Sequence, residues 1–370
     1  MKIKRKGIAG TENKRDCIIT VSKGDGFILK SKVKEMFDEH IEELVKKKLD
    51  ELNLKAKVEI QENGALDYVI LARLESAIAK ACNEKIPDEM VARKEMEGLR
   101  RTRMYVPGNN PRMMNNAGAY GCDCIILDLE DSVAIEQKED ARYLVKNALK
   151  SLDFSAETWV RINKETAKED ISIIKYGSPH GVCIPKVESN EDVHSIEKIL
   201  MEEGMKAKLM PIVETAKGVA NASEIAGASE NIVAIAFGAE DFTRDIGGKR
   251  KWHSLLYARG RIIIAAKAFG IQALDTIYPN VNDMEGLREE TIKIIEMGFD
   301  GKGVIHPSQI EIIHECFMPT KEEIEEAKKI VDTIEKAKKK GLGTASINGK
   351  MIDLPVEKKA RRILKMGGIL

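Results

Sequence analysis

The sequence predicts an α/β protein built around a (β/α)8 barrel, with a small α+β domain before it and a C-terminal lid or arm after it. From Arg101 onward, short apolar runs alternate strictly with stretches whose apolar residues recur at helical spacing. Eight candidate strands are the number that a closed parallel barrel needs, and more than a five- or six-stranded open sheet has. They are expected at residues 102–106, 124–129, 159–162, 182–185, 208–213, 233–237, 271–276 and 303–305.

Helical patterns fill the gaps between these strands. The clearest of them lie at residues 134–149, 192–203, 255–269 and 284–298. The strand–helix alternation defines a barrel domain at 100–318, in which residues at the carboxyl ends of the strands are expected to do the chemistry.

The first 83 residues are expected to fold as a separate unit. Strand-like runs at 17–21 and 57–61 accompany helical patterns at 34–52 and 66–81, which together make an α+β domain of modest size. Residues 84–99 include a proline and many charges, so they are expected to be a linker.

Composition and charge indicate a globular protein of the cytoplasm. The 370 residues carry 60 basic and 60 acidic side chains, so no net charge attracts the chain to nucleic acid or to a membrane. No run is long and apolar enough for a transmembrane helix. The six cysteines lack paired zinc spacing and are expected to be reduced, structural thiols. We therefore expect a cytoplasmic location and neither a nucleic-acid nor a membrane partner.

Two of the predicted strands end abruptly in acidic residues. The run at 209–213 leads into Glu214, and the run at 233–239 leads into Glu240 and Asp241. These carboxylates are expected to lie together, because neighbouring parallel strands end at the same edge. Two carboxylates suit Mg²⁺, which prefers oxygen ligands and keeps several waters. The sequence therefore predicts a Mg²⁺ site here, with solvation of the strand ends or helix capping as the alternative.

One arginine and one lysine also follow predicted strands. Arg161 can hold a carboxylate in a bidentate fork, which a lysine cannot match, although a structural salt bridge is the alternative. Lys186 suggests a rival chemistry, in which its amine forms a Schiff base with a carbonyl substrate. No other neighbouring residue favours that rival.

The C-terminal segment, residues 319–370, lies beyond the eighth strand–helix unit and is not needed to close the barrel. It contains a charged helical pattern at 321–340, glycines within 341–343, the apolar Ile347 and the stretch 351–355. A lid over the barrel, or an arm onto a neighbouring subunit, is the expected role. The alternative is a packed terminal helix without a part in catalysis.

Ordered motifs along residues 100–355 carry a specific resemblance. They are RRTRMYVPGNNP at 100–111, ILDLED at 126–131, VRIN at 160–163, PKVE at 185–188, PIVET at 211–215, FGAEDF at 237–242, GFDGKGVIHP at 298–307 and MIDLP at 351–355. This part of the chain closely resembles the citrate lyase β-subunit family, the HpcH/HpaI-like lyases of CoA thioesters that include malyl-CoA and citramalyl-CoA lyases. The resemblance implies a TIM barrel, usually trimeric.

The resemblance also implies a set of site residues. Mg²⁺ would be bound at Glu214 and Asp241, and Arg161 would grip a keto-acid carboxylate. Asp353 matches an acid that reaches into the active site of an adjacent subunit, where it would transfer a proton. Asp128, Glu130 and Asp131 are candidates to hold metal-bound waters. Further substrate contacts are expected from Glu214, Lys186 and Arg101. Arg101 lies with Arg100 and Arg103 in a basic stretch that suits the CoA phosphates, with a solvated run of charges as the alternative.

Residues 1–83 resemble the small acyl carrier (γ) subunit of citrate lyase. The matches are AGT at 9–11, Asp16 and GALDYVILAR at 64–73. In that family a serine three residues after the AGT turn carries the prosthetic group, but this chain has Lys14 there and no serine within 12–15. A phosphodiester-linked arm needs a hydroxyl, so we expect the carrier function to be lost.

The implied activity is that of a Mg²⁺-dependent carbon–carbon lyase. It would cleave a 3-hydroxyacyl-CoA thioester of the citramalyl-CoA or malyl-CoA type to an acyl-CoA and a 2-keto acid. One alternative is a citrate lyase β component that acts on a citryl thioester held by a separate carrier, with other citrate lyase-type subunits as partners. The other is a non-enzymatic assembly or docking protein.

Overall fold

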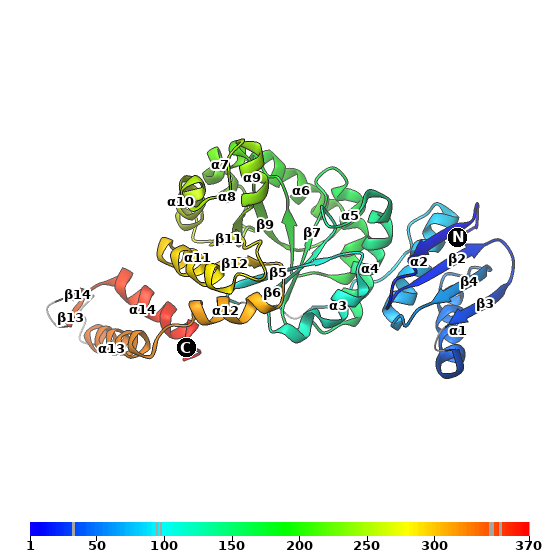
Figure 1. Ribbon diagram of the computed structural model, residues 1–370, viewed down its shortest axis with the longest axis horizontal. Helices are drawn as coiled ribbons and strands as arrows, with labels where there is room; N and C mark the ends of the chain where they lie inside the picture. Colours follow the sequence, from blue (N-terminus) through cyan, green and yellow to red (C-terminus); the bar gives the residue numbers. More distant parts are fainter. Residues whose placement is uncertain (32–33, 94, 97, 340–343, 348–349, 370) are drawn as a thin grey trace.

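Eight parallel strands close into a barrel in the computed structural model, which describes residues 1–31, 34–93, 95–96, 98–339, 344–347 and 350–369 (Figure 1). The strands follow one another in chain order, and the last pairs with the first. The predicted barrel is confirmed, and each strand begins and ends within two residues of its expected bounds. The strands are β5 (Thr102–Pro107), β6 (Cys124–Asp128), β7 (Glu157–Arg161), β8 (Gly181–Ile184), β9 (Lys208–Val213), β10 (Ala234–Phe237), β11 (Gln272–Ile277) and β12 (Gly301–Val304).

The eighth strand starts at Gly301, two residues earlier than the sequence suggested. Gly301 lies in close contact with the chain just before β5. A Cβ atom on Gly301 would lie 1.9 Å from the carbonyl oxygen of Arg100. Glycine normally weakens a strand, but here it alone allows the two backbones to approach this closely.

Helices surround the barrel, as expected for apolar strands that are covered on their outer face. The four helices anticipated from the sequence are present as α4 (Lys138–Ser151), α6 (Asn190–Glu202), α10 (Trp252–Ala268) and α11 (Met284–Met297). The other helices between the strands are shorter. They are α3 (Pro111–Ala117), α5 (Ala167–Ile174), α7 (Ala216–Ala220), α8 (Ala222–Ala226), α9 (Ala239–Asp245) and α12 (Ser308–Phe317).

The amino-terminal end of the barrel is plugged. Trp159 is fully buried inside the barrel, and the guanidinium of Arg100 lies 5.4 Å from the centre of its ring. Arg100 also donates to both carboxylate oxygens of Glu157, at 2.5 and 2.9 Å. Because this end is filled by a buried ion pair and an aromatic ring, access to the barrel interior is from the carboxyl ends of the strands.

The small N-terminal domain is a four-stranded sheet in the order β1-β2-β4-β3 with two helices. The expected strands and helices are present as β2 (Cys17–Ser22), β4 (Lys57–Glu62), α1 (Lys34–Glu51) and α2 (Asp67–Cys82). The sequence did not suggest β1 (Gly7–Gly10), which is short and has glycine at both ends. Nor did it suggest β3 (Gly26–Ser31), an edge strand with no residue fully buried.

The small domain docks on the barrel by packing α2 against α4 (Figure 1). Asp140 of α4 accepts hydrogen bonds from the Gly10 backbone at 3.0 Å and the Ser76 hydroxyl at 2.6 Å, and it pairs with Lys80. Deeper in the interface, Lys146 of α4 pairs with Glu75 of α2 at 2.7 Å, and each side chain is only 1% exposed. The two domains are therefore joined by buried, oriented charge pairs.

Residues 84–99 contain no helix or strand in the part that the structure describes, yet they are tied to the barrel. Asp88 accepts from Lys146 at 2.7 Å and from Lys150 at 2.6 Å. Burial alone would raise the pKa of Asp88, but the two ammonium groups outweigh burial and lower that pKa to about 2. Arg93 donates to the backbone oxygens of Leu149 and Gly177. The segment therefore follows the barrel surface closely.

After the barrel, the chain forms an arm on the side of α11 and α12, at the opposite end of the molecule from the small domain (Figure 1). The arm consists of α13 (Lys321–Lys338), a hairpin of β13 (Ala345–Ile347) and β14 (Lys350–Ile352), and α14 (Leu354–Met366). The glycines noted at 341–343 lie outside the described residues. No helix in the described part of the chain has both the length and the apolar character needed to cross a membrane.

Replacing Asp140 with alanine is expected to loosen the small domain from the barrel. The change leaves three partly buried donors without their acceptor, at a cost of about 1–3 kcal/mol in the free energy of docking. Limited proteolysis within residues 84–99 should become faster, and thermal unfolding should start at a lower temperature. The control is Glu139→Ala on the same helix, since Glu139 has no ion pair with the described part of the small domain. Equal protease resistance of the two variants would contradict this role of Asp140.

Candidate active site

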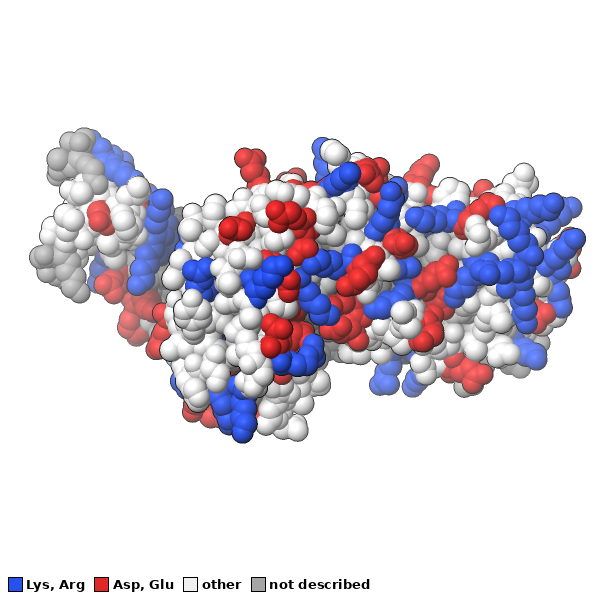
Figure 2. All heavy atoms as spheres, turned by 90° about the horizontal axis from the view of Figure 1, so that it is seen from above, with Lys and Arg blue, Asp and Glu red and all other residues white. Residues whose placement is uncertain are grey.

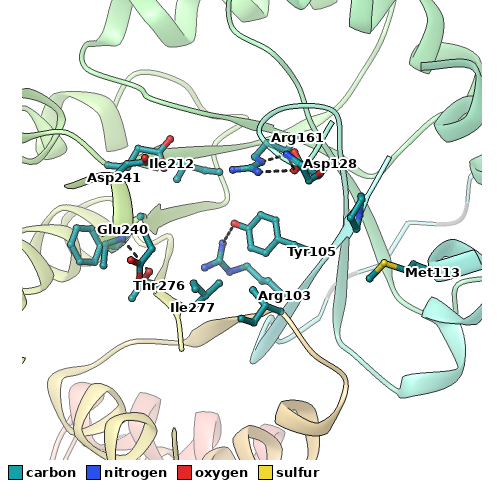
Figure 3. A pocket seen from close by; sticks show the side chains of 17 residues that line it. Arg103, Tyr105, Met113, Asp128, Arg161, Ile212, Glu240, Asp241, Thr276 and Ile277 are labelled. Carbon is teal, nitrogen blue, oxygen red and sulfur yellow. Dashed lines mark hydrogen bonds and ion pairs between the residues drawn. The ribbon is translucent and has the colours of Figure 1, made fainter. Parts of the chain in front are cut away.

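A cavity of about 360 Å³ opens at the carboxyl ends of the barrel strands (Figure 3). Its walls combine apolar side chains with two arginines and several carboxylates, a mixture typical of sites that bind small organic anions. The polar residues used below are Arg103, Tyr105, Asp128, Arg161, Glu214 and Asp241, and the apolar ones are Ile212, Phe237, Ile277 and Ile305.

Glu214 and Asp241 reach the cavity from two neighbouring strands. Glu214 directly follows β9 and is 3% exposed, whereas Asp241 lies in the first turn of α9, after β10. Glu214 Oε1 accepts a hydrogen bond of 2.8 Å from the backbone N–H of Lys186. Despite this bond, burial and the charges of Glu130 and Asp241 raise the pKa of Glu214 to about 8. A buried carboxylate facing like charges is an arrangement that a bound cation would stabilise.

The backbone around Glu214 is shaped to hold its carboxylate. A Cβ atom on Gly238 would lie 2.5 Å from Glu214 Oε2, so only glycine leaves room for the side chain in its present position. Lys186, which donates its N–H to the other oxygen, has φ 49°, a left-handed conformation unusual for lysine. Two local backbone features therefore fix the direction of the Glu214 carboxylate.

The donor set fits Mg²⁺ rather than a metal that needs a complete protein cage. Among the described residues, no group of three or more His, Cys, Asp or Glu side chains is gathered closely enough to hold a metal ion. Mg²⁺ is usually bound by one or two carboxylates, and it keeps waters or substrate oxygens at its other positions. Glu214 and Asp241 match that requirement.

Arg161 lies across the cavity from these carboxylates, at the end of β7 (Figure 3). Its Nε and Nη2 each donate to Asp128, both at 2.7 Å, and its Nη1 lies 2.9 Å from Glu130 Oε2. The structural salt bridge that was the alternative for Arg161 is therefore present, but it leaves hydrogens at Nη1 and Nη2 for a further anion. Burial alone would raise the pKa of Asp128, yet Arg161 lowers it, so the pair is ionic.

Lys186 is held as an ammonium ion by Glu130, although neither residue is among those that line the cavity. Its Nζ lies 2.6 Å from Glu130 and 3.5 Å from Asp131. Burial by itself would lower the pKa of Lys186, but Glu130 outweighs burial and raises that pKa above its ordinary value. A Schiff-base lysine needs the opposite shift, because only the neutral amine is nucleophilic. The geometry therefore disfavours the rival chemistry and leaves Lys186 as a positive charge.

Two of the expected residues lie away from the cavity. Arg101 precedes β5 and makes a bidentate pair with Asp123, both bonds being 2.8 Å, at the amino-terminal end of the barrel. The expectation that Arg101 contacts substrate is therefore wrong for this geometry, because the residue sits at the plugged end. Asp353 caps α14 by accepting from the N–H of Val356 at 3.2 Å, and within its own chain it lies in the arm.

Two polar residues of the cavity wall, Arg103 and Tyr105, were not predicted from the sequence to lie there. Arg103 and Tyr105 are two residues apart in β5, so their side chains point to the same face of the strand, into the barrel. Arg103 had been grouped with the basic stretch that suits CoA phosphates, but the structure buries it inside the barrel at 1% exposure. The sequence did carry a signal for this position. Arg103 lies two residues before Tyr105 in an otherwise apolar strand, so the alternation of side chains places both on one face of the strand.

Replacing Gly238 with alanine is expected to weaken Mg²⁺ binding by about tenfold or more, because the new methyl group must push the Glu214 carboxylate aside. Isothermal titration with MgCl₂ measures this loss directly. The control is Gly260→Ala in α10, where an added Cβ meets nothing within 4 Å. The control should bind Mg²⁺ normally and gain about 0.5–1 kcal/mol in stability from helix propensity. Unchanged Mg²⁺ affinity in Gly238→Ala would show that Glu214 is not a ligand.

The affinity for Mg²⁺ is also expected to decrease as the pH is lowered. With its pKa raised to about 8, Glu214 is largely protonated at neutral pH in the metal-free protein. Mg²⁺ requires the carboxylate, so binding releases a proton, and the Kd for Mg²⁺ rises by about tenfold per pH unit below that pKa. Titrations in buffers of different ionisation enthalpy would detect the released proton. A Kd that is constant between pH 6 and 8 would contradict this linkage.

A barrel with an acidic, arginine-flanked cavity at its carboxyl ends defines an enzyme-like site for a small anion and a divalent cation. Residues 101–307 match the family model described as HpcH/HpaI aldolase/citrate lyase. The chain belongs to this family.

Relatives of known identity cover most of the chain. Citrate lyase subunit beta of Leuconostoc mesenteroides subsp. cremoris is 43% identical over 283 residues, which are 73% of this chain and 94% of that protein. Mitochondrial citramalyl-CoA lyase of Rattus norvegicus is 34% identical over 289 residues, 72% of this chain and 86% of that protein. The crystal structure of CitE from Mycobacterium tuberculosis in complex with magnesium, acetoacetate and coenzyme A matches with a TM-score of 0.59 and 31% identity, covering 72% of this chain and 98% of that one.

The small domain has a match of its own. Residues 4–81 match an acyl-carrier (ACP) family model that is described as malonate decarboxylase delta subunit (MdcD). The expected likeness to an acyl carrier is thus confirmed, and the description names a subunit of malonate decarboxylase where the sequence had suggested the γ subunit of citrate lyase.

Proposed function

We propose that the protein is a Mg²⁺-dependent carbon–carbon lyase, which cleaves a 3-hydroxyacyl thioester to an acyl thioester and a 2-keto acid. The observation that carries this proposal is the buried Glu214 carboxylate with Asp241 beside it, facing Arg161 across one cavity. The family and the ligands named for the related CitE structure, magnesium, acetoacetate and coenzyme A, support the same reaction class.

Four residues of the cavity have a role in the proposed reaction. Glu214 and Asp241 hold Mg²⁺, which would supply Lewis acidity to the substrate's hydroxyl and carboxylate oxygens. Arg161 binds the carboxylate through its remaining Nη hydrogens, and Asp128 keeps the guanidinium in position. The bond between the hydroxyl-bearing carbon and the α carbon of the thioester breaks as the hydroxyl proton leaves. The thioester enolate then accepts a proton at its α carbon.

The proton donor for the enolate is proposed to be Asp353 of a neighbouring copy. Within one chain Asp353 lies in the arm, outside the residues that line the cavity. An arm that extends from the barrel is suited to reach another subunit, and we propose a homotrimer with each Asp353 completing the next site. Asp128, Glu130 and Asp131 are proposed to order waters around the metal.

The thioester carrier is proposed to be free CoA. Lys14 is exposed on the small domain and offers no hydroxyl for a phosphodiester-linked arm. On the face shown in Figure 2, Lys and Arg side chains gather over the small domain, whereas both signs alternate over the barrel. The second candidate is a citrate lyase β component that acts on a thioester held by a separate carrier protein. The identity of 43% to a citrate lyase beta subunit favours that candidate over a purely structural role.

The deciding experiment combines a mass measurement with an assay. The protein is produced in a host that contains the carrier-modifying enzymes, and its intact mass is measured. Keto-acid release from citryl-CoA, citramalyl-CoA, malyl-CoA and a citryl thioester of a separate carrier protein is then followed with and without Mg²⁺. An unmodified mass with Mg²⁺-dependent release supports a lyase of free CoA esters. A mass increased by a nucleotide-linked arm, without turnover of free esters, overturns the free-CoA assignment. An unmodified protein with no turnover of free or carrier-bound esters would contradict the lyase activity itself.

A further inference from the structure

Arg103 is a buried arginine whose guanidinium has few partners. The residue is 1% exposed, and its Nη2 donates to the carbonyl oxygen of Asp275 at 2.7 Å. Its Nη1 makes only a long contact of 3.4 Å with the Tyr105 hydroxyl and one of 3.8 Å with the sulfur of Met210. Its buried Nε has no hydrogen-bond partner. Most of the donor capacity of this side chain is therefore unused.

The other buried arginines of the described chain differ from Arg103 in one respect. Arg73 pairs with Asp16 at 2.8 Å, Arg100 with Glu157 at 2.5 Å, and Arg259 with Asp275 at 2.9 Å. Within the described residues, Arg103 alone of these buried arginines has no carboxylate within ion-pair distance. A buried guanidinium without a counter-charge is costly, so an anion that binds there is strongly favoured.

The position of Arg103 determines which part of a substrate it can meet. Its side chain lines the same cavity as Arg161, but one step deeper along β5 than Tyr105. Tyr105 separates the two guanidiniums: its hydroxyl contacts Arg103, and its ring centre lies 5.3 Å from the guanidinium of Arg161 (Figure 3). The cavity thus offers one cation opposite the proposed metal ligands and a second cation at its floor.

We infer that Arg103 binds a second carboxylate of the substrate and selects hydroxyacyl thioesters that carry one. This inference rests on the proposed lyase function. Arg161 and the metal ligands hold the hydroxyl and carboxylate that all the candidate substrates share, so the floor of the cavity receives the remaining substituent on the hydroxyl-bearing carbon. That substituent is hydrogen in a malyl thioester, methyl in a citramalyl thioester and carboxymethyl in a citryl thioester. Only carboxymethyl supplies the anion that Arg103 lacks.

The reaction is unchanged by this selection. The carbon–carbon bond breaks, the hydroxyl loses its proton, and the α carbon of the acyl thioester gains one, so no oxidant or further reactant is needed. The carboxymethyl group remains on the keto acid, which is released as a dicarboxylate. Arg103 touches that group and not the bond that breaks, so its effect is on specificity.

The test compares citryl-CoA with citramalyl-CoA for the wild type, Arg103→Met and Arg103→Lys. The wild type is expected to prefer citryl-CoA in kcat/KM by about 100-fold, since a site built to bond a polar group rejects an analogue that lacks it. Arg103→Met should lose most of its activity on citryl-CoA and keep or raise its activity on citramalyl-CoA. Arg103→Lys should retain part of the preference, because it keeps the charge but not the planar fork.

A binding measurement separates this inference from the proposed function. In the presence of Mg²⁺, oxaloacetate should bind the wild type more tightly than pyruvate, and Arg103→Met should reverse that order, whether or not any thioester turns over. Two results would overturn the role of Arg103 and leave the lyase assignment standing. One is a wild type whose kcat/KM is equal for citramalyl-CoA and citryl-CoA. The other is a folded Arg103→Met variant that loses both activities equally. If no thioester is cleaved and neither keto acid binds, the proposed function fails as well.

Discussion

Replacing Glu214 with glutamine is expected to lower kcat/KM for thioester cleavage by about 1,000-fold or more, because Glu214 is one of the two carboxylates that would hold Mg²⁺ and the Lewis acidity that Mg²⁺ would supply is lost with it. Glutamine keeps the size of the side chain and can still accept from the Lys186 backbone N–H. The metal-free variant should remain folded, since glutamine is neutral, as is the protonated Glu214 that burial and the charges of Glu130 and Asp241 favour. Mg²⁺ should raise the melting temperature of the wild type and leave that of the variant unchanged.

Glu240→Gln is the matched control for this experiment. Glu240 precedes Asp241 in the same helix, but its side chain is 52% exposed and pairs with Arg250 at 2.6 Å. The control should retain most of the activity and the full thermal shift with Mg²⁺. Asp241→Asn, in contrast, should behave like Glu214→Gln. If Glu240→Gln and not Asp241→Asn abolishes the thermal shift, the second metal ligand has been assigned to the wrong residue.

Replacing Arg161 with lysine is expected to lower kcat/KM by about 100-fold, with most of the loss in substrate binding. A lysine keeps the positive charge between Asp128 and Glu130, but it cannot hold Asp128 in a bidentate bond and still present a fork to the substrate. Stability should change less than for alanine, which would leave Asp128 buried at 1% exposure without its partner. Steady-state kinetics and thermal unfolding measure the two effects separately.

Arg142→Lys provides the comparison, because Arg142 also holds a buried carboxylate but lies outside the cavity. Its Nε donates to Asp170 at 2.6 Å, on the outer helices of the barrel. This variant should lose stability and keep its kinetic constants. A loss of kcat/KM in Arg142→Lys as large as that in Arg161→Lys would indicate that both act only through the stability of the barrel.

The barrel was predictable from the sequence because its signal is repeated. Every strand is a short apolar run followed by a helical pattern, and a single weak strand such as β12, with two glycines in four residues, is supported by the count of the others. The small domain has no such repetition. Its strand β3 has a short apolar run at 27–29, but it has no fully buried residue and lies at the sheet edge, so no buried face distinguishes it from a loop.

The candidate site was predictable where a side chain lies at a strand end or in the first turn after it, as Asp241 does. Glu214 and Arg161 end strands, and the structure places both in the cavity. Arg101 and Arg103 look equivalent in the sequence, but they lie on either side of the amino-terminal boundary of β5, which begins at Thr102. The two residues that separate them decide whether the arginine pairs with Asp123 at the closed end, as Arg101 does, or enters the barrel, as Arg103 does. The role proposed for the arm residue Asp353 requires a second copy of the chain, about which a single sequence carries no geometric information.

The ion pairs that dock the small domain on α4 have a consequence for how the protein responds to dilution. A free carrier-like subunit would leave its partner as the concentration falls, whereas a tethered domain with a preformed interface rebinds at an effective concentration that dilution does not change. Because both parts belong to one chain, their ratio is one to one in every copy, and the contacts of Glu75, Lys146 and Asp140 keep them docked. Neither the amount of protein made nor the size of the assembly can alter that ratio.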